Sequence, residues 1–218
     1  MRTRLGLLIV GLALVGVGVA GCSSTTSGTS GAVQDDATTS PSGVTAASAS
    51  SCSEGGACAI GDIGPGNGIV FYVASTPFTS AAPCGTSCTY LEAQTSDAGL
   101  LPYCVGPGAT ASIPNSNGTA IGAGFQNTMS ITSTSECSSG AGFTATAPSG
   151  GLQDWYLPSL GEGMALYENY VAVGGLEGTY WTSTQANAKQ ASYVSDTTNT
   201  GLTDPKSLDM NVRAIRAF

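Results

Sequence analysis

Histidine is absent from this chain of 218 residues, and positively charged residues are scarce. Without histidine, the chain can supply neither a Ser-His-Asp or Cys-His catalytic arrangement nor a histidine-ligated zinc or iron centre. The six lysine and arginine residues stand against fourteen aspartate and glutamate residues, so the formal net charge is −8. A surface of this sign repels the phosphates of nucleic acids and of anionic lipids. We therefore expect no nucleic-acid partner.

The first 21 residues have the features of an export signal. Basic residues at positions 2 and 4 precede an apolar run of 16 residues, Leu5–Ala20, which is shorter than most membrane-spanning helices. The sequence VAGC at 19–22 resembles the lipobox of bacterial lipoproteins, which implies cleavage before Cys22 and a diacylglyceryl group on its sulfur. An uncleaved anchor and a plain secretory signal are the alternatives. We expect palmitate-type acyl chains at Cys22 to hold the chain at the bacterial cell membrane, facing outside the cytoplasm.

Residues 22–51 are predicted to form a flexible tether that begins with the lipidated cysteine. The segment is rich in Ser, Thr, Gly and Ala and has no aromatic or basic residue, so it cannot bury a hydrophobic core. Its r.m.s. span is roughly 30 Å by coil statistics. Cleavage before Cys22 would remove two cations and no acid, which leaves four cations against fourteen acids and a net charge of −10. Membrane association then depends on the acyl chains.

Residues 52–218 are long enough for one globular domain. They contain six cysteines, and an even number in an exported chain favours disulfides, which could pair in 15 ways. Proximity in the sequence favours the pairs Cys52–Cys58, Cys84–Cys88 and, as a longer tie, Cys104–Cys137. The spacing of the second pair is also compatible with half of a zinc or redox site, although the chain has no histidine to complete it.

Hydrophobic patterns predict a mixture of strands and helices. The segment GDIGPGNGIVFYV at 61–73 has four glycines in its first eight residues, but they precede a β-branched and aromatic run. A phosphate-binding loop follows a strand and opens a helix, so this order predicts a tight turn entering a strand instead. Helices are expected within 123–136 and, behind a capping box of Ser159 and Glu162, over 160–173. Strands are expected at 69–73, 89–93, 179–184, 191–195 and 211–218, with a polar hairpin at 196–209.

Five short motifs follow one another in the order seen in a bacterial family: GDIGPGNGIVFYV, GTAIGAGFQNT, DWYLPSLGEGMALY, YWTSTQ and the final VRAIRAF. Together they resemble the exported domain found at the C-terminus of the Legionella collagen-like adhesin, over about residues 61–218. The third and fourth motifs are also similar to formylglycine-generating enzymes and other relatives of C-type lectins. The resemblance implies an α+β, C-type-lectin-like domain of twisted antiparallel strands with one or two packed helices. The expected disulfides would staple this domain.

Three properties of these relatives do not transfer to this chain. The adhesin binds sulfated polysaccharide, which needs a basic patch that four cations cannot provide. Formylglycine generation needs a cysteine pair in the C-terminal half, and no cysteine follows Cys137. Calcium, the usual ligand of C-type-lectin-like folds, needs clustered oxygen ligands, and the chain has no Asp-x-Asp-x-Asp motif. We therefore expect no metal and no cofactor.

Carboxylates offer the one catalytic alternative, a glycosidase that uses two of the residues Asp154, Glu162, Glu168 and Glu177. However, Glu162 is better explained as a helix cap, and Glu168 as part of a solvated helix face. We therefore expect a protein without enzymatic activity.

Aromatic residues provide the candidate ligand site. Exposed tyrosine and tryptophan rings stack on sugar rings, and the candidates here are Tyr156, Tyr180 and Trp181. Core packing is the alternative, and we favour it for Trp155 and Trp181. The sequence predicts a cell-surface binding domain for a glycan, a cell-wall component or a protein partner. A structural envelope lipoprotein without a small ligand is the alternative class.

Two of the cations lie close together in the C-terminal segment. Side chains alternate along a strand, so Arg213 and Arg216 would point to opposite faces, each mainly apolar. An unpaired buried guanidinium is strongly disfavoured. We therefore predict that at least one arginine is buried and paired with an acid, with Asp154 or Glu162 as the expected partner. The alternative is that both guanidinium groups reach water at the sheet edge.

Overall fold

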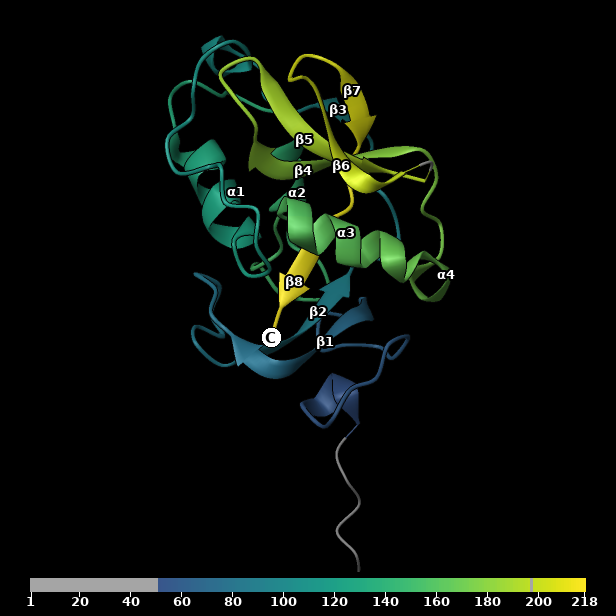
Figure 1. The fold of residues 1–218 in the computed structure, drawn as a ribbon. Helices are drawn as coiled ribbons and strands as arrows, with labels where there is room; N and C mark the ends of the chain where they lie inside the picture. The colour runs from purple at the N-terminus through teal and green to yellow at the C-terminus, as the bar shows by residue number, and fades with distance from the viewer. Residues whose placement is uncertain (1–50, 197) are drawn as a thin grey trace, which may run out of the picture. The chain divides into compact units, whose positions relative to one another are not determined.

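Two β-sheets and four α-helices form the described part of the chain, residues 51–196 and 198–218 of the computed structural model (Figure 1). These residues fall within one compact unit. The predicted signal peptide, the lipid attachment at Cys22 and the tether up to residue 50 lie outside the described residues. The α+β class predicted from the sequence is confirmed.

The smaller sheet contains β1 (Ile69–Phe78), β2 (Cys88–Ala93) and β8 (Ile215–Ala217), in the order β1-β2-β8. Both pairings are antiparallel, with Ile69 opposite Ala93 and Leu91 opposite Ala217. β-branched and aromatic side chains begin β1 directly after the glycine-rich turn, as the sequence predicts. Consequently, the first strand of the domain and its C-terminus belong to one sheet.

The larger sheet contains β3 (Leu100–Pro102), β4 (Thr179–Gln185), β5 (Gln190–Ser195), β6 (Thr198–Pro205) and β7 (Asp209–Asn211). Its order is β3-β7-β4-β5-β6, and all pairings are antiparallel except that between β4 and β7. Sheet B, as we call this sheet, is therefore mixed, whereas the sequence predicted antiparallel strands alone.

Two sequence predictions near the C-terminus are wrong. The segment 196–209 is not merely a polar hairpin, because residues 198–205 form β6 and pair with β5. The expected strand over 211–218 is broken: β7 ends at Asn211, and residues 212–214 carry the chain from sheet B to β8 in the smaller sheet. The break leaves room for the Arg213 side chain to turn toward loops instead of neighbouring strands.

Four helices are present where the resemblance implied one or two: α1 (Gly124–Ser133), α2 (Ala141–Ala145), α3 (Leu160–Glu168) and α4 (Tyr170–Val173). Short 3₁₀ turns occur at Cys52–Glu54 and Pro107–Ala109. The capping box at α3 is confirmed, since the Ser159 backbone N–H donates to the Glu162 carboxylate at 2.7 Å. The predicted helix over 160–173 is interrupted at Asn169, which separates α3 from α4.

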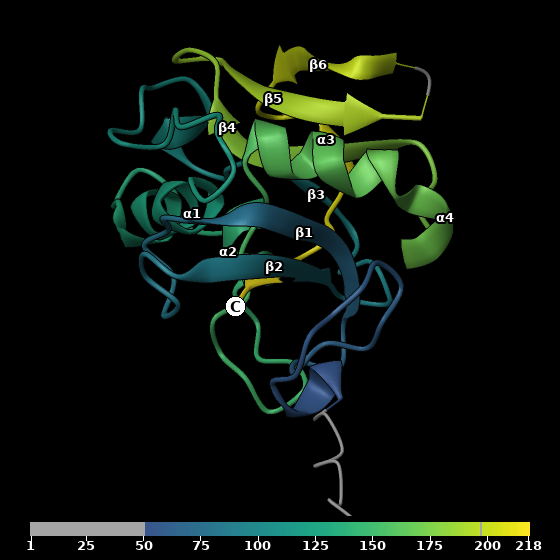
Figure 2. The same ribbon diagram turned by 60° about the horizontal axis from the view of Figure 1, so that its bottom comes forward.

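The hydrophobic core has two clusters. One lies between α3 and the strands on either side of it, with Phe71, Leu91 and Leu166 fully buried. Figure 2 shows α3 between β1 of the smaller sheet and β5 of sheet B. The second cluster surrounds Trp155 and Trp181, which are at most 1% exposed. The prediction that these two tryptophans belong to the core is therefore confirmed.

Three disulfides staple the domain, and they are the pairs that sequence proximity favoured: Cys52–Cys58, Cys84–Cys88 and Cys104–Cys137. The first two close loops of a few residues, while the third joins positions 33 residues apart. The Cys84–Cys88 pair is thus a disulfide, and the zinc or redox alternative for that spacing is wrong.

Candidate functional site

The three aromatic residues predicted to bind a ligand are buried. Tyr156 and Trp181 have no exposed surface and Tyr180 is 1% exposed, so no sugar ring can stack on them. Side chains alternate along β4, so Tyr180 lies in one core cluster and Trp181 in the other. Tyr156, in the turn before α3, lies in the same cluster as Tyr180. The ligand-binding prediction for these residues is therefore wrong.

The glycine-rich turn at 64–68 binds an anion that belongs to the protein itself. The backbone N–H groups of Gly66 and Gly68 donate to the Glu92 carboxylate at 2.9 and 3.0 Å. A Cβ atom on Gly64, Gly66 or Gly68 would come within 3 Å of Glu92, Trp155 or the Ala93 carbonyl oxygen. These glycines let the backbone approach the carboxylate closely, and a phosphate has no place there.

Arg216 lies between two acids. Its Nε donates to Asp154 at 2.7 Å, which confirms the predicted pair, and its NH1 donates to Glu92 at 3.1 Å. Glu162 was the other expected partner, and that prediction is wrong. The Glu162 carboxylate accepts instead from the backbone N–H groups of Ser159 and Gly122.

Glu162 is thus a buried carboxylate held by neutral donors. The Tyr156 hydroxyl also donates to it at 3.2 Å. Burial raises the pKa of the Glu162 carboxyl above its usual value, against the opposing effect of these donors. Asp154 and Glu162, two of the four candidate catalytic carboxylates, are therefore engaged in bonds that hold the fold together.

Arg213 is 2% exposed, so the prediction that one arginine is buried and paired is confirmed. Its partner is Asp97, at 2.7 Å from Nε, and not one of the two expected acids. The remaining guanidinium donors bind the carbonyl oxygens of Gln94 at 2.9 Å, Gly175 at 2.8 Å and Gly174 at 3.4 Å. Arg213 therefore joins the loop after β2 to the loop after α4.

The loop after α4, residues 174–178, is fixed by several groups beneath it. Gly174, Gly175 and Gly178 have φ values of 71°, 61° and 79°, which strongly favour glycine. The Tyr180 hydroxyl donates to Asp97 at 2.8 Å and accepts from the Glu177 backbone N–H at 3.1 Å. Burial raises the pKa of Tyr180 to about 12, so this hydroxyl stays protonated and able to donate at neutral pH.

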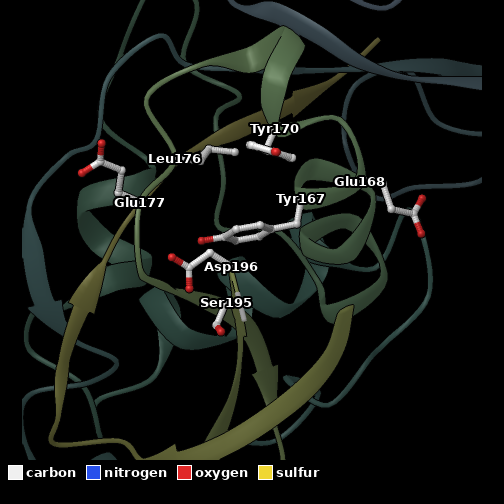
Figure 3. Close-up of a pocket in the computed structure, with 7 residues that line it drawn as sticks. All are labelled: Tyr167, Glu168, Tyr170, Leu176, Glu177, Ser195 and Asp196. Carbon is white, nitrogen blue, oxygen red and sulfur yellow. The ribbon is translucent and has the colours of Figure 1, made fainter. Parts of the chain in front are cut away.

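A pocket of about 570 Å³ opens above this loop. It is lined by the end of α3, by α4, by the loop 174–178 and by the end of β5, through Tyr167, Glu168, Tyr170, Leu176, Glu177, Ser195 and Asp196. Figure 3 shows the Tyr167 ring across the middle, with Tyr170 and Leu176 on one side and Asp196 beside its hydroxyl end. We refer to this cavity as the tyrosine pocket.

The tyrosine pocket combines a rigid ring with an exposed one. Tyr167 is half-buried, packs edge-on against Tyr180 at 5.8 Å and donates its hydroxyl to the Gly178 carbonyl at 2.6 Å. Tyr170 is 54% exposed, because the break at Asn169 turns it away from the core. Ring faces beside carboxylate oxygens suit a ligand with both apolar CH faces and hydrogen-bond donors, which is the surface of a sugar.

The sequence alone does not indicate Tyr167 and Tyr170 as site residues, because the spacing of Met164, Tyr167 and Val171 fits one helix face. Two features of the sequence could have indicated the break in the helix: Asn169 is a poor helix former, and two glycines follow at 174 and 175. In the described residues, no three metal-ligating side chains lie together, and no helix is long and apolar enough to cross a membrane.

Comparison with known proteins gives little similarity. No protein-family model matches this chain, and neither does any curated protein sequence. Among solved structures, a fimbrial protein from Bacteroides ovatus ATCC 8483 is similar over 69% of this chain, with 16% sequence identity and a TM-score of 0.42. The similar part spans 44% of the length of that protein's chain. A likeness at this level does not establish a shared fold.

Proposed function

We propose that this chain is an exported, lipid-anchored surface protein that binds a glycan or cell-wall component through the tyrosine pocket, without catalysis. The observation that carries the proposal is the pocket itself, in which a half-buried tyrosine ring, with Asp196 beside its hydroxyl, lies next to an exposed tyrosine ring. The Arg213–Asp97–Tyr180 network supports it, since a preorganised loop lowers the entropy lost on binding.

The finer family assignment belongs to the same proposal. A C-type-lectin-like fold and kinship with the domain of the collagen-like adhesin would both suit a binding role at the cell surface. The ligand would differ from the sulfated polymer of that adhesin, because the mature chain carries a net charge of −10 after cleavage before Cys22.

Removal of the exposed ring tests the glycan-binding role. Tyr170→Ala in the full-length protein is expected to weaken binding to isolated cell wall, or to the glycans retained on an array, by about tenfold, equivalent to about 1.4 kcal/mol. Val171→Ala is the matched control, because Val171 is 78% exposed on the same short helix and does not line the pocket. If Tyr170→Ala bound as tightly as Val171→Ala and the wild type, the ligand would lie elsewhere. If the wild-type protein bound neither isolated cell wall nor any glycan on the array, the proposal would be refuted.

A protein partner is the second candidate, and one observation favours it. Tyr170 and Val171 form an exposed apolar rim at α4, as at many protein contacts. In that case Val171→Ala would weaken binding to the partner as much as Tyr170→Ala does, since the whole rim would be covered.

The lipid anchor is tested at Cys22. Cys22→Ala is expected to abolish incorporation of radioactive palmitate and to release the protein from the membrane fraction, because the acyl chains would supply the membrane affinity of this acidic chain. Cys22→Ser offers a second variant of nearly unchanged size. Labelling that persists in both variants would show that the anchor is attached at another position.

A further inference from the structure

Three acidic residues line the tyrosine pocket, and one of them, Asp196, lies beside the Tyr167 hydroxyl. Glu168, Glu177 and Asp196 contribute carboxylates, and neither lysine nor arginine is among the lining residues. Figure 3 shows Asp196 at the hydroxyl end of Tyr167, while the carboxylates of Glu168 and Glu177 lie at the flanks and point outward. In the described residues, no ion pair within 4 Å reaches any of these three acids.

Several donors near the pocket are already used by the protein, and the lining side chains that can donate are the hydroxyls of tyrosine and serine. The Tyr167 hydroxyl donates to the Gly178 carbonyl, so its oxygen faces a ligand as an acceptor. The Glu177 backbone N–H donates to Tyr180, and the Asp196 backbone N–H points to the Gly178 carbonyl at 3.4 Å. The nearest guanidinium, that of Arg213, binds Asp97 and the loop carbonyls behind the pocket. The lining therefore offers a ligand hydroxyls and carboxylates but no positively charged donor.

Charge and ring faces favour the same kind of ligand. Carboxylates around a concave site create a negative potential that concentrates cations. A protonated amine beside Asp196 would gain a charge-assisted hydrogen bond, and a tyrosine face nearby would add a cation–π attraction. An acidic sugar would meet repulsion, and an N-acetyl group would present a neutral amide in place of the ammonium charge.

We propose that the tyrosine pocket selects sugars with a protonated amine, such as unacetylated hexosamine units, over their neutral N-acetylated counterparts. This inference rests on the proposed glycan-binding function and narrows its ligand class. The ring of the sugar would pack on Tyr170 and Tyr167, and its ammonium group would lie against Asp196.

Two soluble oligosaccharides test the preference directly. We would titrate the full-length protein with a glucosamine tetramer and with an N-acetylglucosamine tetramer, at pH 6 and low salt, and measure both affinities by calorimetry. Binding of the glucosamine tetramer is expected to be at least about tenfold tighter, and 0.5 M salt should reduce the difference because it screens exposed charges.

Asp196→Asn is the decisive variant, because it keeps the shape of the pocket and removes the central charge. It is expected to abolish most of the preference for the amine, while Tyr170→Ala weakens binding of both tetramers. Asp209→Asn is the matched control, since Asp209 is exposed and lies outside the pocket lining. Asp196 is exposed as well, so the variant should fold, which thermal unfolding would verify.

Each outcome separates the inference from the function on which it rests. Equal affinity for the two tetramers, or a preference that Asp196→Asn leaves intact, overturns the amine inference and leaves glycan binding standing. If neither tetramer nor any array glycan binds, glycan binding itself is wrong. A lysine-rich peptide that binds the wild-type protein but not Asp196→Asn, when neither tetramer binds, would overturn both and indicate a protein ligand.

Discussion

Arg213→Met is expected to lower the free energy of unfolding by about 3 kcal/mol, the order of loss found when one partner of a buried ion pair is removed. Methionine fills a similar volume but donates no hydrogen bond. Asp97 would lose its partner, and the carbonyl groups of Gln94 and Gly175 would lose their donors. Since Gly175 belongs to the loop 174–178, the tyrosine pocket should lose its ligand affinity in the same variant.

Lys189→Met is the control for the loss of one positive charge. Lys189 is exposed, and its replacement should change the free energy of unfolding by less than about 0.5 kcal/mol. Urea unfolding gives the stability of both variants, and ligand binding is measured at a temperature where Arg213→Met remains folded. If Arg213→Met retained wild-type stability and binding, the guanidinium would not hold this loop in solution.

Local rules predicted the parts of the fold that depend on near neighbours in the chain. The capping box of Ser159 and Glu162 acts within four residues, and its geometry follows from the residue types alone. The disulfides Cys52–Cys58 and Cys84–Cys88 close short loops, so proximity was a sufficient guide. α1 likewise formed inside the range that its apolar spacing indicated.

Long-range partners were harder to predict, because the sequence does not show which loops the fold brings together. Arg213 and Asp97 are 116 positions apart in the sequence. They meet because residues 212–214 leave sheet B beside the loop after β2. Asp154 is an expected partner of one of the two arginines and pairs with Arg216, whereas Glu92, the second partner of Arg216, has the pattern of an ordinary strand residue. Charged residues in strands are usually solvated, and the glycine-rich turn that buries this one lies more than 20 residues earlier.

Lys206 is a second buried cation whose partners the sequence does not predict. It has no exposed surface, and its ammonium group donates to the carbonyl oxygens of Gly108 and Ala111 and to Gln185 at 2.6 to 3.0 Å. Burial lowers the pKa of Lys206 to about 8. Nothing in the surrounding sequence predicts burial, because two of the three oxygens that accept from this lysine come from a loop about 95 residues earlier, and the third comes from Gln185.

The candidate site could not be predicted because it depends on a break in a helix. Continuous helical spacing would place Tyr167 and Val171 together on the buried face. The interruption at Asn169 ends that face, so Tyr170 and Val171 become exposed and the loop 174–178 curls beneath them. The motifs DWY and YW, which contain the aromatic residues predicted to bind a ligand, instead belong to the hydrophobic core.

Glu92→Gln is expected to lower the free energy of unfolding by about 3 kcal/mol although it changes the side-chain volume hardly at all. The hydrogen-bond partners of this fully buried carboxylate are all donors: the N–H groups of Gly66 and Gly68, and NH1 of Arg216. An amide has one acceptor oxygen, so its NH₂ group would point at one of these donors. Removal of the charge also leaves Arg216 with Asp154 alone.

Two further variants separate this mechanism from a general effect of lost charge. Glu136→Gln removes one negative charge at a partly exposed position and should alter the free energy of unfolding by less than about 0.5 kcal/mol. Gly66→Ala leaves Glu92 intact but places a Cβ atom 2.6 Å from Trp155 and 2.8 Å from the carboxylate, so it should cost about 1–3 kcal/mol as an overpacked site. If Glu92→Gln unfolded at the same urea concentration as the wild type while Gly66→Ala was destabilised, the turn would serve close packing against Trp155, and the carboxylate that it surrounds would be replaceable.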